Sequence, residues 1–240
     1  MGNIKYKMKV VILCGGLGSR LAEETKLIPK PMVKLGRKPI IKHIMDIYNF
    51  YGYKKFILAT GYKNKIIEKY FANKKNVTCF YTGKNSMTGG RLLRLKKFFN
   101  EDEDFMLTYG DGLTNQNLKK LHKFHLINRK IATMTVVKPT ARFGEVFLNG
   151  IKVKKFEEKP QLNQNWINGG FFVLNSKIFN YIKKDSTMLE REPLRKLVKK
   201  KEVVAFKHKN FWQCMDTMRD KNILMKMLRK KNAPWKKLKK

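Results

Sequence analysis

Residues 13–32 read LCGGLGSRLAEETKLIPKPM, and this stretch decides the fold. The apolar run Lys9–Leu13 predicts a strand, which leads into a turn that carries three glycines: Gly15, Gly16 and Gly18. Glycine lets backbone amides approach an anion closely. Arg20 and Lys30 follow the turn and add the positive charge that a phosphate chain requires. The stretch therefore predicts a binding site for a nucleoside triphosphate.

Two better-known glycine loops do not fit these residues. A P-loop requires Gly-Lys followed by Ser or Thr, and this tripeptide does not occur in the sequence. The dinucleotide fingerprint G-x-G-x-x-G is matched by Gly16 and Gly18, but Leu21 occupies its third glycine position. That fingerprint also needs an acidic residue after the second strand, whereas the expected strand Lys55–Thr60 leads into Gly61.

The length and composition of the chain favour one α/β domain. The 240 residues suit one α/β domain or one with a small appendage, and residues 236–240 form a basic tail. Three cysteines without CxxC spacing predict reduced thiols in a cytoplasmic protein. No apolar run approaches the roughly 20 residues of a membrane span. The opening residues, MGNIKYKMK, lack the apolar segment of a signal peptide.

The chain is strongly basic, with 54 Lys and Arg against 18 Asp and Glu and a formal net charge of +36. Such a field attracts anions. The sequence has no zinc-finger spacing and no RNP-like aromatic strand, so we expect no specific nucleic-acid partner. We expect most lysines on solvated surface. The alternative is a weak affinity of the tail for a polyanion or a membrane surface.

Strand and helix patterns alternate along the first half of the chain. The expected strands are Met8–Leu13, Phe56–Ala59, Val77–Tyr81, Phe105–Thr108 and Ile131–Val137. The expected helices between them are Lys38–Tyr51, Lys63–Ala72, Thr88–Phe99 and Asn115–Leu126. This alternation predicts an α/β fold with a Rossmann-like, mostly parallel mixed sheet and helices on both faces.

The second half of the chain is less regular. Glu145–Phe147 and Ile151–Phe156 flank Asn149-Gly150 and predict a hairpin. Gly170–Leu174 predicts one further strand. The remaining expected helices are Ser176–Ile182, Arg191–Lys200 and Thr217–Arg229.

Further motifs follow the glycine loop in order along the chain. After PKPM come GRKPI (36–40), SMTGGR (86–91), YGDG (109–112), EEKP (157–160), INGGFFVLN (167–175) and FWQCMDTMRD (211–220). With APW near the C-terminus, the set resembles the sugar nucleotidyltransferases and, among them, the glucose-1-phosphate cytidylyltransferase family. The resemblance covers roughly residues 8–235. It implies one nucleotidyltransferase domain, with a nucleotide-binding half to about residue 137 and a sugar-binding half over about 138–235.

The resemblance implies transfer of a cytidylyl group from CTP to glucose 1-phosphate, which gives CDP-glucose and pyrophosphate. Both substrates are anions, so positioning and electrostatic stabilisation would supply most of the catalysis. Mg²⁺ is the implied cofactor, at the positions of Asp111 and Asp216, because Mg²⁺ is usually held by one or two carboxylates and phosphate oxygens. The implied product would supply deoxysugars of surface polysaccharide.

The predicted catalytic residues are Lys30, Arg20 and Asp111. Asp111 follows the expected strand Phe105–Thr108, and ligands of open α/β sheets lie at the carboxyl ends of strands. The predicted nucleotide-binding residues are Leu13, Gly15, Gly16, Gly18, Ser19, Arg20, Lys30, Ser86, Thr88, Gly89 and Gly90.

The resemblance also implies the residues that bind the sugar phosphate: Arg91, Glu158, Lys159, Asn168 and Gly169. Lys159 would contact the phosphate, and Arg91 near a helix N-terminus would contact an anion. Glu158 and Asn168 would hydrogen-bond the sugar hydroxyls.

The chain departs from the family pattern at two places. Ile28 stands where the family commonly has lysine, so one phosphate contact is in doubt. Thr82–Asn85 is a short connection where family members carry a longer segment, which leaves a homo-oligomer possible and its form open. The alternatives are another sugar-1-phosphate nucleotidyltransferase, using UTP or dTTP or a different sugar phosphate, and an inactive homologue that senses nucleotides.

Overall fold

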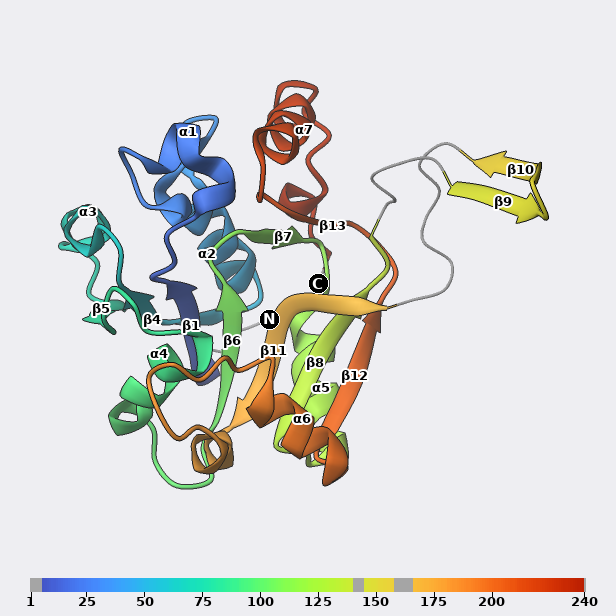
Figure 1. The fold of residues 1–240 in the computed structure, drawn as a ribbon. Coiled ribbons are helices and arrows are strands. Elements are labelled where there is room, and N and C mark those ends of the chain that lie inside the picture. Colours follow the sequence, from blue (N-terminus) through green and yellow to red (C-terminus); the bar gives the residue numbers. More distant parts are fainter. Residues whose placement is uncertain (1–5, 140–144, 158–165, 240) are drawn as a thin grey trace.

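The computed structural model describes residues 6–139, 145–157 and 166–239. Its centre is one sheet of seven strands in the order β12-β8-β11-β6-β1-β4-β5 (Figure 1). In chain order these strands are β1 (Tyr6–Cys14), β4 (Tyr53–Thr60), β5 (Val77–Tyr81), β6 (Asp104–Tyr109), β8 (Ala132–Val137), β11 (Ile167–Asn175) and β12 (Val203–His208).

Most neighbouring strands of this sheet are parallel. β1 runs parallel to both β4 and β6, β4 runs parallel to β5, and β8 runs parallel to β12. β11 is antiparallel to both of its neighbours, β6 and β8. The prediction of a mostly parallel mixed sheet is therefore confirmed.

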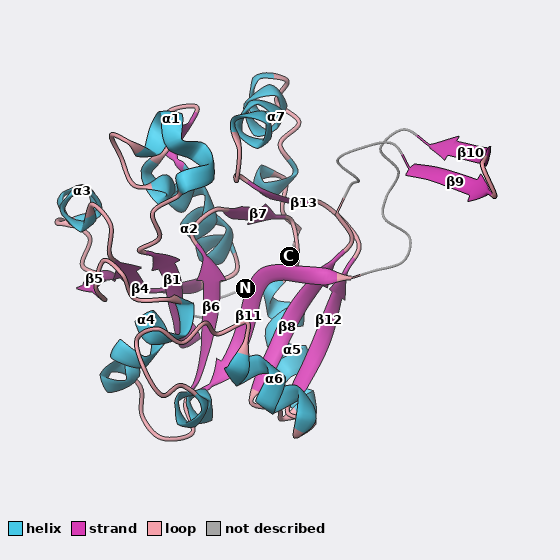
Figure 2. Ribbon diagram, viewed as in Figure 1, coloured by secondary structure: helices cyan, strands magenta, loops and turns pink. Residues whose placement is uncertain are grey.

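Strand β1 is buried on both faces, and its alternating side chains enter two different cores. Val10 and Ile12 point into one core, whereas Val11 and Leu13 point into the other. Helices α2 (Ile40–Phe50), α3 (Asn64–Phe71), α5 (Leu118–Asn128) and α7 (Met218–Arg229) supply the first core. Helices α4 (Thr88–Arg94) and α6 (Glu192–Lys199) supply the second (Figure 2). Burying each such aliphatic side chain contributes roughly 1.5–3 kcal/mol, and helices cover both faces as predicted.

The two halves of the chain share this sheet. β11 lies between β6 and β8, and β12 forms the far edge beside β8. No break in the sheet therefore marks residue 137. The division at about residue 137 stays a prediction of which residues bind the nucleotide and which bind the sugar.

Several elements differ from the sequence-based expectation. The expected helix Thr88–Phe99 ends at Arg94 and continues as the 3₁₀ helix η3 (Lys96–Phe98), and Ser176–Tyr181 is also a 3₁₀ helix, η4. Helix α2 begins at Ile40 because Pro39, in extended conformation, is its N-cap. Strand β12 and the two short paired strands β7 (Gly112–Thr114) and β13 (Trp212–Cys214) were not predicted.

The remaining elements lie outside the main sheet. β9 (Glu145–Asn149) and β10 (Lys152–Glu157) pair as an antiparallel hairpin, which confirms that prediction. β2 (Lys34–Leu35) pairs with β3 (Lys38–Pro39). The start of the basic tail forms part of the 3₁₀ helix η5 (Pro234–Lys236), where Trp235 is buried. Within the described ranges, no helix is long and apolar enough to cross a membrane.

Candidate active site

A cavity of about 360 Å³ opens where β1 and β6 end. Its volume falls within the range of small-molecule sites, about 300–1,000 Å³. Every predicted site residue from Leu13 to Arg20 lines it, as do Lys30, Asp111 and Asp216. Four residues of the SMTGGR motif, Ser86, Met87, Thr88 and Arg91, form another part of its lining. The chain thus brings most of the predicted nucleotide-binding residues together.

The glycine loop leaves β1 at Cys14 and turns into two short helices, η1 (Ser19–Leu21) and α1 (Ala22–Thr25). Gly18 has a left-handed backbone with φ of 68°, a conformation that favours glycine. The hydroxyl of Thr25 donates to the carbonyls of Gly18 and Leu21 at 3.1 Å each and holds the turn. A Cβ atom on Gly16 would meet no protein atom within 4 Å. The loop therefore leaves open space beside Gly16.

Arg91 is buried and fixes the glycine loop to the rest of the site. Its Nη2 donates to the carbonyl of Gly15 at 2.8 Å, and its Nη1 donates to the carbonyl of Gly83 at 2.6 Å and to the hydroxyl of Thr82 at 2.9 Å. Further acceptors are the carbonyls of Thr60 and Lys84. Burial lowers the pKa of Arg91. Protein acceptors take up its Nη hydrogens in this structure, so Arg91 holds the loop, and its predicted contact with an anion stays a prediction.

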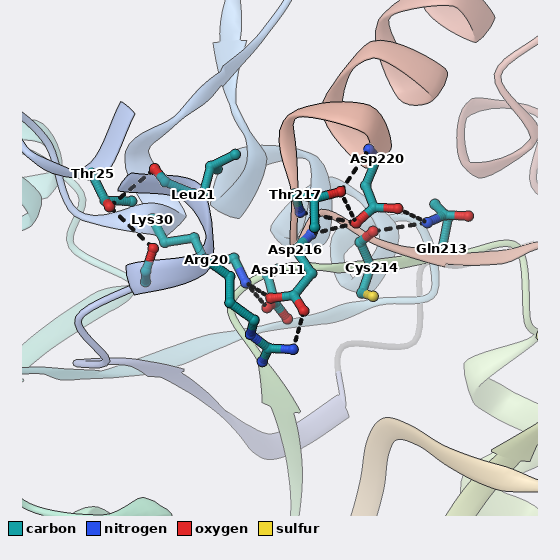
Figure 3. Close-up of polar contacts among 11 residues, drawn as sticks. Arg20, Leu21, Thr25, Lys30, Asp111, Gln213, Cys214, Asp216, Thr217 and Asp220 are labelled. Carbon is teal, nitrogen blue, oxygen red and sulfur yellow. Dashed lines mark hydrogen bonds and ion pairs between the residues drawn. The ribbon is translucent and has the colours of Figure 1, made fainter. Parts of the chain in front are cut away.

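Lys30 lies between the two predicted metal ligands (Figure 3). Its Nζ donates to Asp111 Oδ2 at 2.7 Å and to Asp216 Oδ1 at 2.8 Å, and its side chain is only 12% exposed. Burial alone would lower the pKa of Lys30, but the Asp111 carboxylate and the two hydrogen bonds outweigh it, so the pKa is raised. Arg20 forms an ion pair with Asp216 from the solvent side. Two cations and two carboxylates thus meet at one wall of the cavity.

Asp111 precedes β7 and Asp216 follows β13, so the pairing of these two strands brings together two residues that are far apart in sequence. Cys214 is paired with Gly112, and the amide of Met215 donates to the carbonyl of Asp111 at 2.9 Å. The sequence reasoning missed this strand pair.

Asp216 is held in place by the N-terminus of α7. Thr217 is the N-cap of the helix, and its hydroxyl accepts from the amide of Asp220. The Asp220 carboxylate accepts in turn from the amides of Asp216 at 3.1 Å and Thr217 at 2.9 Å (Figure 3). Thr-x-x-Asp ahead of an apolar helix is a capping-box pattern that could have identified Asp220 from sequence.

The donor set of Asp111 and Asp216 fits a magnesium ion. One oxygen of each carboxylate contacts Lys30 Nζ, so the two oxygens converge on the same position. Among the described residues, no group of three or more His, Cys, Asp or Glu is arranged to hold a metal. Two carboxylates suffice when substrate phosphate oxygens and water complete the octahedron of Mg²⁺.

The SMTGGR motif divides into residues that reach the cavity and residues that pack. Ser86 and Thr88 line the cavity. Gly89 and Gly90 do not, because the backbone of the segment before α6 lies directly against them. A Cβ on Gly90 would lie 2.0 Å from the carbonyl oxygen of Asp185, and one on Gly89 would lie 2.8 Å from that of Thr187. The structure therefore gives these two glycines a packing role.

Of the predicted sugar-phosphate residues, Asn168 contacts Tyr109, which lines the cavity. Asn168 donates to the Tyr109 hydroxyl at 3.1 Å, and Gly169 accepts from Trp212 Nε1 at 2.7 Å. Glu158 and Lys159 lie outside the described residues, so their roles stay predictions. Tyr109 and its partner Glu190 were not among the predicted site residues.

The sheet, the glycine loop at the end of β1 and the converging carboxylates are typical of an α/β protein that binds nucleotides. The sequence model of the family described as Nucleotidyl transferase matches residues 9–220. The chain belongs to the nucleotidyl transferase family.

Relatives with curated names lie within this family. The chain is 44% identical to the glucose-1-phosphate cytidylyltransferase of Salmonella typhimurium, over 95% of this chain and 99% of the relative. It is 40% identical to the probable glucose-1-phosphate cytidylyltransferase of Bacillus subtilis, with the same coverage. Among solved structures, HddC from Yersinia pseudotuberculosis matches with a TM-score of 0.72 and 25% identity, over 92% of this chain and 99% of HddC.

Proposed function

We propose that this protein transfers a cytidylyl group from CTP to glucose 1-phosphate and releases CDP-glucose and pyrophosphate. The observation that carries the proposal is the placement of Lys30 between Asp111 and Asp216 at the wall of the glycine-loop cavity. The names of the relatives at 44% and 40% identity support the choice of CTP and glucose 1-phosphate.

The reaction joins two anions, and the residues of the site meet that charge. A phosphate oxygen of the sugar phosphate attacks the α-phosphorus of CTP, a new P–O bond forms, and the bond to the β-phosphate breaks to release pyrophosphate. No side-chain nucleophile is needed. The open space at Gly16 lets the loop backbone approach the triphosphate, and Arg20 and Lys30 supply positive charge beside it. Alignment and charge stabilisation thus supply the catalysis.

We propose that Asp111 and Asp216 also hold a divalent cation, Mg²⁺ by the expectation from sequence. When bound, the ion would supply positive charge that offsets the charge of the substrate phosphates. Lys30, which contacts both carboxylates in this structure, would add a second positive charge beside the phosphates. Removal of the cation with a chelator is expected to stop turnover.

On the sugar side, we propose that Lys159 binds the phosphate of glucose 1-phosphate and that Glu158 and Asn168 bind sugar hydroxyls. The position of Asn168 beside Tyr109 supports its part of this assignment. The protein would act in the cytoplasm, as its three free thiols suggest.

A second candidate keeps the chemistry and changes the substrate. The connection Thr82–Asn85, which is short in comparison with the family pattern, leads directly into the cavity wall at Ser86 and Met87. A different rim would admit a different nucleotide or sugar phosphate. An inactive nucleotide sensor is disfavoured because Lys30, Asp111 and Asp216 are retained and correctly assembled.

The test is direct identification of the product. Purified protein is incubated with CTP, glucose 1-phosphate and Mg²⁺, and the mixture is followed by ³¹P NMR. The proposal expects two coupled diphosphate signals of CDP-glucose together with pyrophosphate. Formation of a different nucleotide sugar in a mixture of all four ribonucleotides and dTTP would favour the second candidate instead.

A further inference from the structure

Glu190 joins two walls of the cavity although it was not predicted as a site residue. It lies between η4 and α6, and its Oε1 accepts from the Tyr109 hydroxyl at 2.5 Å. Its Oε2 accepts from the Thr88 hydroxyl at 2.6 Å. Thr88 accepts in turn from the amide of Leu189 at 2.9 Å. Both partners of the carboxylate, Tyr109 and Thr88, line the cavity.

The direction of these hydrogen bonds follows from the chemistry of the carboxylate. An ionised carboxylate only accepts, so the Tyr109 hydroxyl must point its hydrogen at Glu190. Burial raises the pKa of Tyr109, and the neighbouring Glu190 raises it further, so the hydroxyl keeps its proton. The Tyr109 oxygen is then left as an acceptor, and it receives Asn168 Nδ2 at 3.1 Å.

The orientation of the Asn168 amide is fixed from both ends. Its Nδ2 donates to Tyr109, and its Oδ1 accepts from the amide of Gly170 at 2.8 Å. A flipped amide would place an N–H group against the Gly170 N–H and an oxygen against the Tyr109 oxygen. One hydrogen of Nδ2 has no acceptor in this pair of contacts and can be offered to a substrate hydroxyl.

We propose that Glu190 is a positioning residue that sets sugar recognition by fixing Tyr109 and, through it, the Asn168 amide. The inference rests on the proposed function, since it assigns Asn168 to a hydroxyl of the sugar phosphate. The carboxylate also ties α4 to the segment before α6 through Thr88. Glu190 thus connects the wall from the SMTGGR motif to the wall from YGDG.

The kinetic test compares Glu190→Ala, Tyr109→Phe and the double variant. Each single change is expected to raise the KM for glucose 1-phosphate about tenfold, in line with loss of a hydrogen bond to a charged group. The KM for CTP should rise by less than about threefold. The double variant should be no worse than the more affected single variant, because both changes break one chain. Additive effects, or an equal rise in both KM values, would overturn the proposal.

Glu192→Ala is the matched control. Glu192 lies on the same segment, is exposed, and pairs with Lys196 at 2.6 Å, away from the cavity. Its removal is expected to leave both KM values unchanged. Glu190→Gln retains one carbonyl oxygen for the Tyr109 hydroxyl and should recover part of the loss seen in Glu190→Ala.

A second readout does not depend on turnover. The side-chain amide of Asn168 is followed in ¹H–¹⁵N spectra and assigned by its loss in Asn168→Asp. Glu190→Ala and Tyr109→Phe should shift this signal in the same way, and Glu192→Ala should not. An unmoved Asn168 signal in Glu190→Ala would overturn the positioning role. If the signal moves but no CDP-glucose forms with the wild type, the positioning chain stands and the proposed function fails.

Discussion

The carbonyl oxygen of Gly15 accepts a 2.8 Å hydrogen bond from Arg91 Nη2, across 76 residues of sequence. The contact is so close that a Cβ atom on Gly15 would lie 2.0 Å from Arg91 Nη1. Gly15 and Gly16 are adjacent, yet only Gly15 is packed against the protein. The two glycines therefore serve different purposes, one structural and one open to a ligand.

This difference predicts opposite phenotypes for two neighbouring substitutions. Gly15→Ala should displace Arg91 from its buried acceptors and lower the free energy of unfolding by about 3 kcal/mol. Gly16→Ala should leave stability within about 0.5 kcal/mol of wild type, because no protein atom opposes the new methyl group. It should raise the KM for CTP about tenfold, since the methyl group blocks the triphosphate. Denaturant unfolding and steady-state kinetics measure both effects; equal destabilisation by the two changes would contradict this interpretation.

The carboxylates at the wall of the cavity should be required for turnover. Asp111→Asn and Asp216→Asn should each lower kcat by about 10²–10³, because each removes an anionic ligand of the proposed cation. Asp46→Asn is the control, since Asp46 is another carboxylate paired with two lysines, Lys38 and Lys42, but lies on α2 away from the cavity. Near-normal turnover of Asp111→Asn would remove that residue from the mechanism.

Ile28 illustrates how the structure changes a prediction. From the family pattern alone, Ile28→Lys is expected to help phosphate binding or to be neutral. In the structure, Ile28 is half-buried and packs against the larger hydrophobic core. We now expect Ile28→Lys to lower the free energy of unfolding by about 1–2 kcal/mol without raising turnover. Leu27→Lys is the control, because Leu27 is 78% exposed. A more active and equally stable Ile28→Lys enzyme would show that the lost charge matters.

Three histidines, two of them buried and one half-buried, predict a loss of stability in mild acid. Burial lowers the pKa of His43, His122 and His208 in the folded chain. The unfolded state therefore binds more protons than the folded state as the pH falls below about 6.5, and the free energy of unfolding decreases with it. His43→Gln removes one of these titrating groups, and glutamine can still donate to the Leu35 carbonyl that His43 Nε2 contacts at 2.9 Å, so the variant should flatten part of the slope between about pH 6.5 and 5. Thermal unfolding across this window measures it, and a stability that rises toward pH 5 would contradict the prediction.

Much of the nucleotide side of the site was predictable from local sequence. The glycine loop follows β1 and the Asp111 turn follows β6, and strand ends in a parallel sheet meet at one edge. Lys30 lies close to the glycine loop in sequence, and the structure places all three at one cavity.

Apart from the local capping residue Asp220, the missed features of the site depend on distant pairings. Strand β13 spans only Trp212–Cys214, and its pairing with β7 decides where Asp216 lies. Arg91 was expected to face an anion, but its acceptors come from three separate segments of the chain, at Gly15, Thr60 and Thr82–Gly83. Glu190 stands in a segment without a motif and meets Tyr109 only in the fold. No local periodicity records such contacts.

The most direct test of the central claim is pyrophosphate release by the purified protein with glucose 1-phosphate and Mg²⁺. CTP, UTP, dTTP, ATP and GTP are offered in turn, with and without EDTA. We predict release with CTP well above the other four nucleotides, and its loss when EDTA is present. A preference for another nucleotide would contradict the assignment to CTP, and no release with any of the five would contradict the proposed transfer to glucose 1-phosphate.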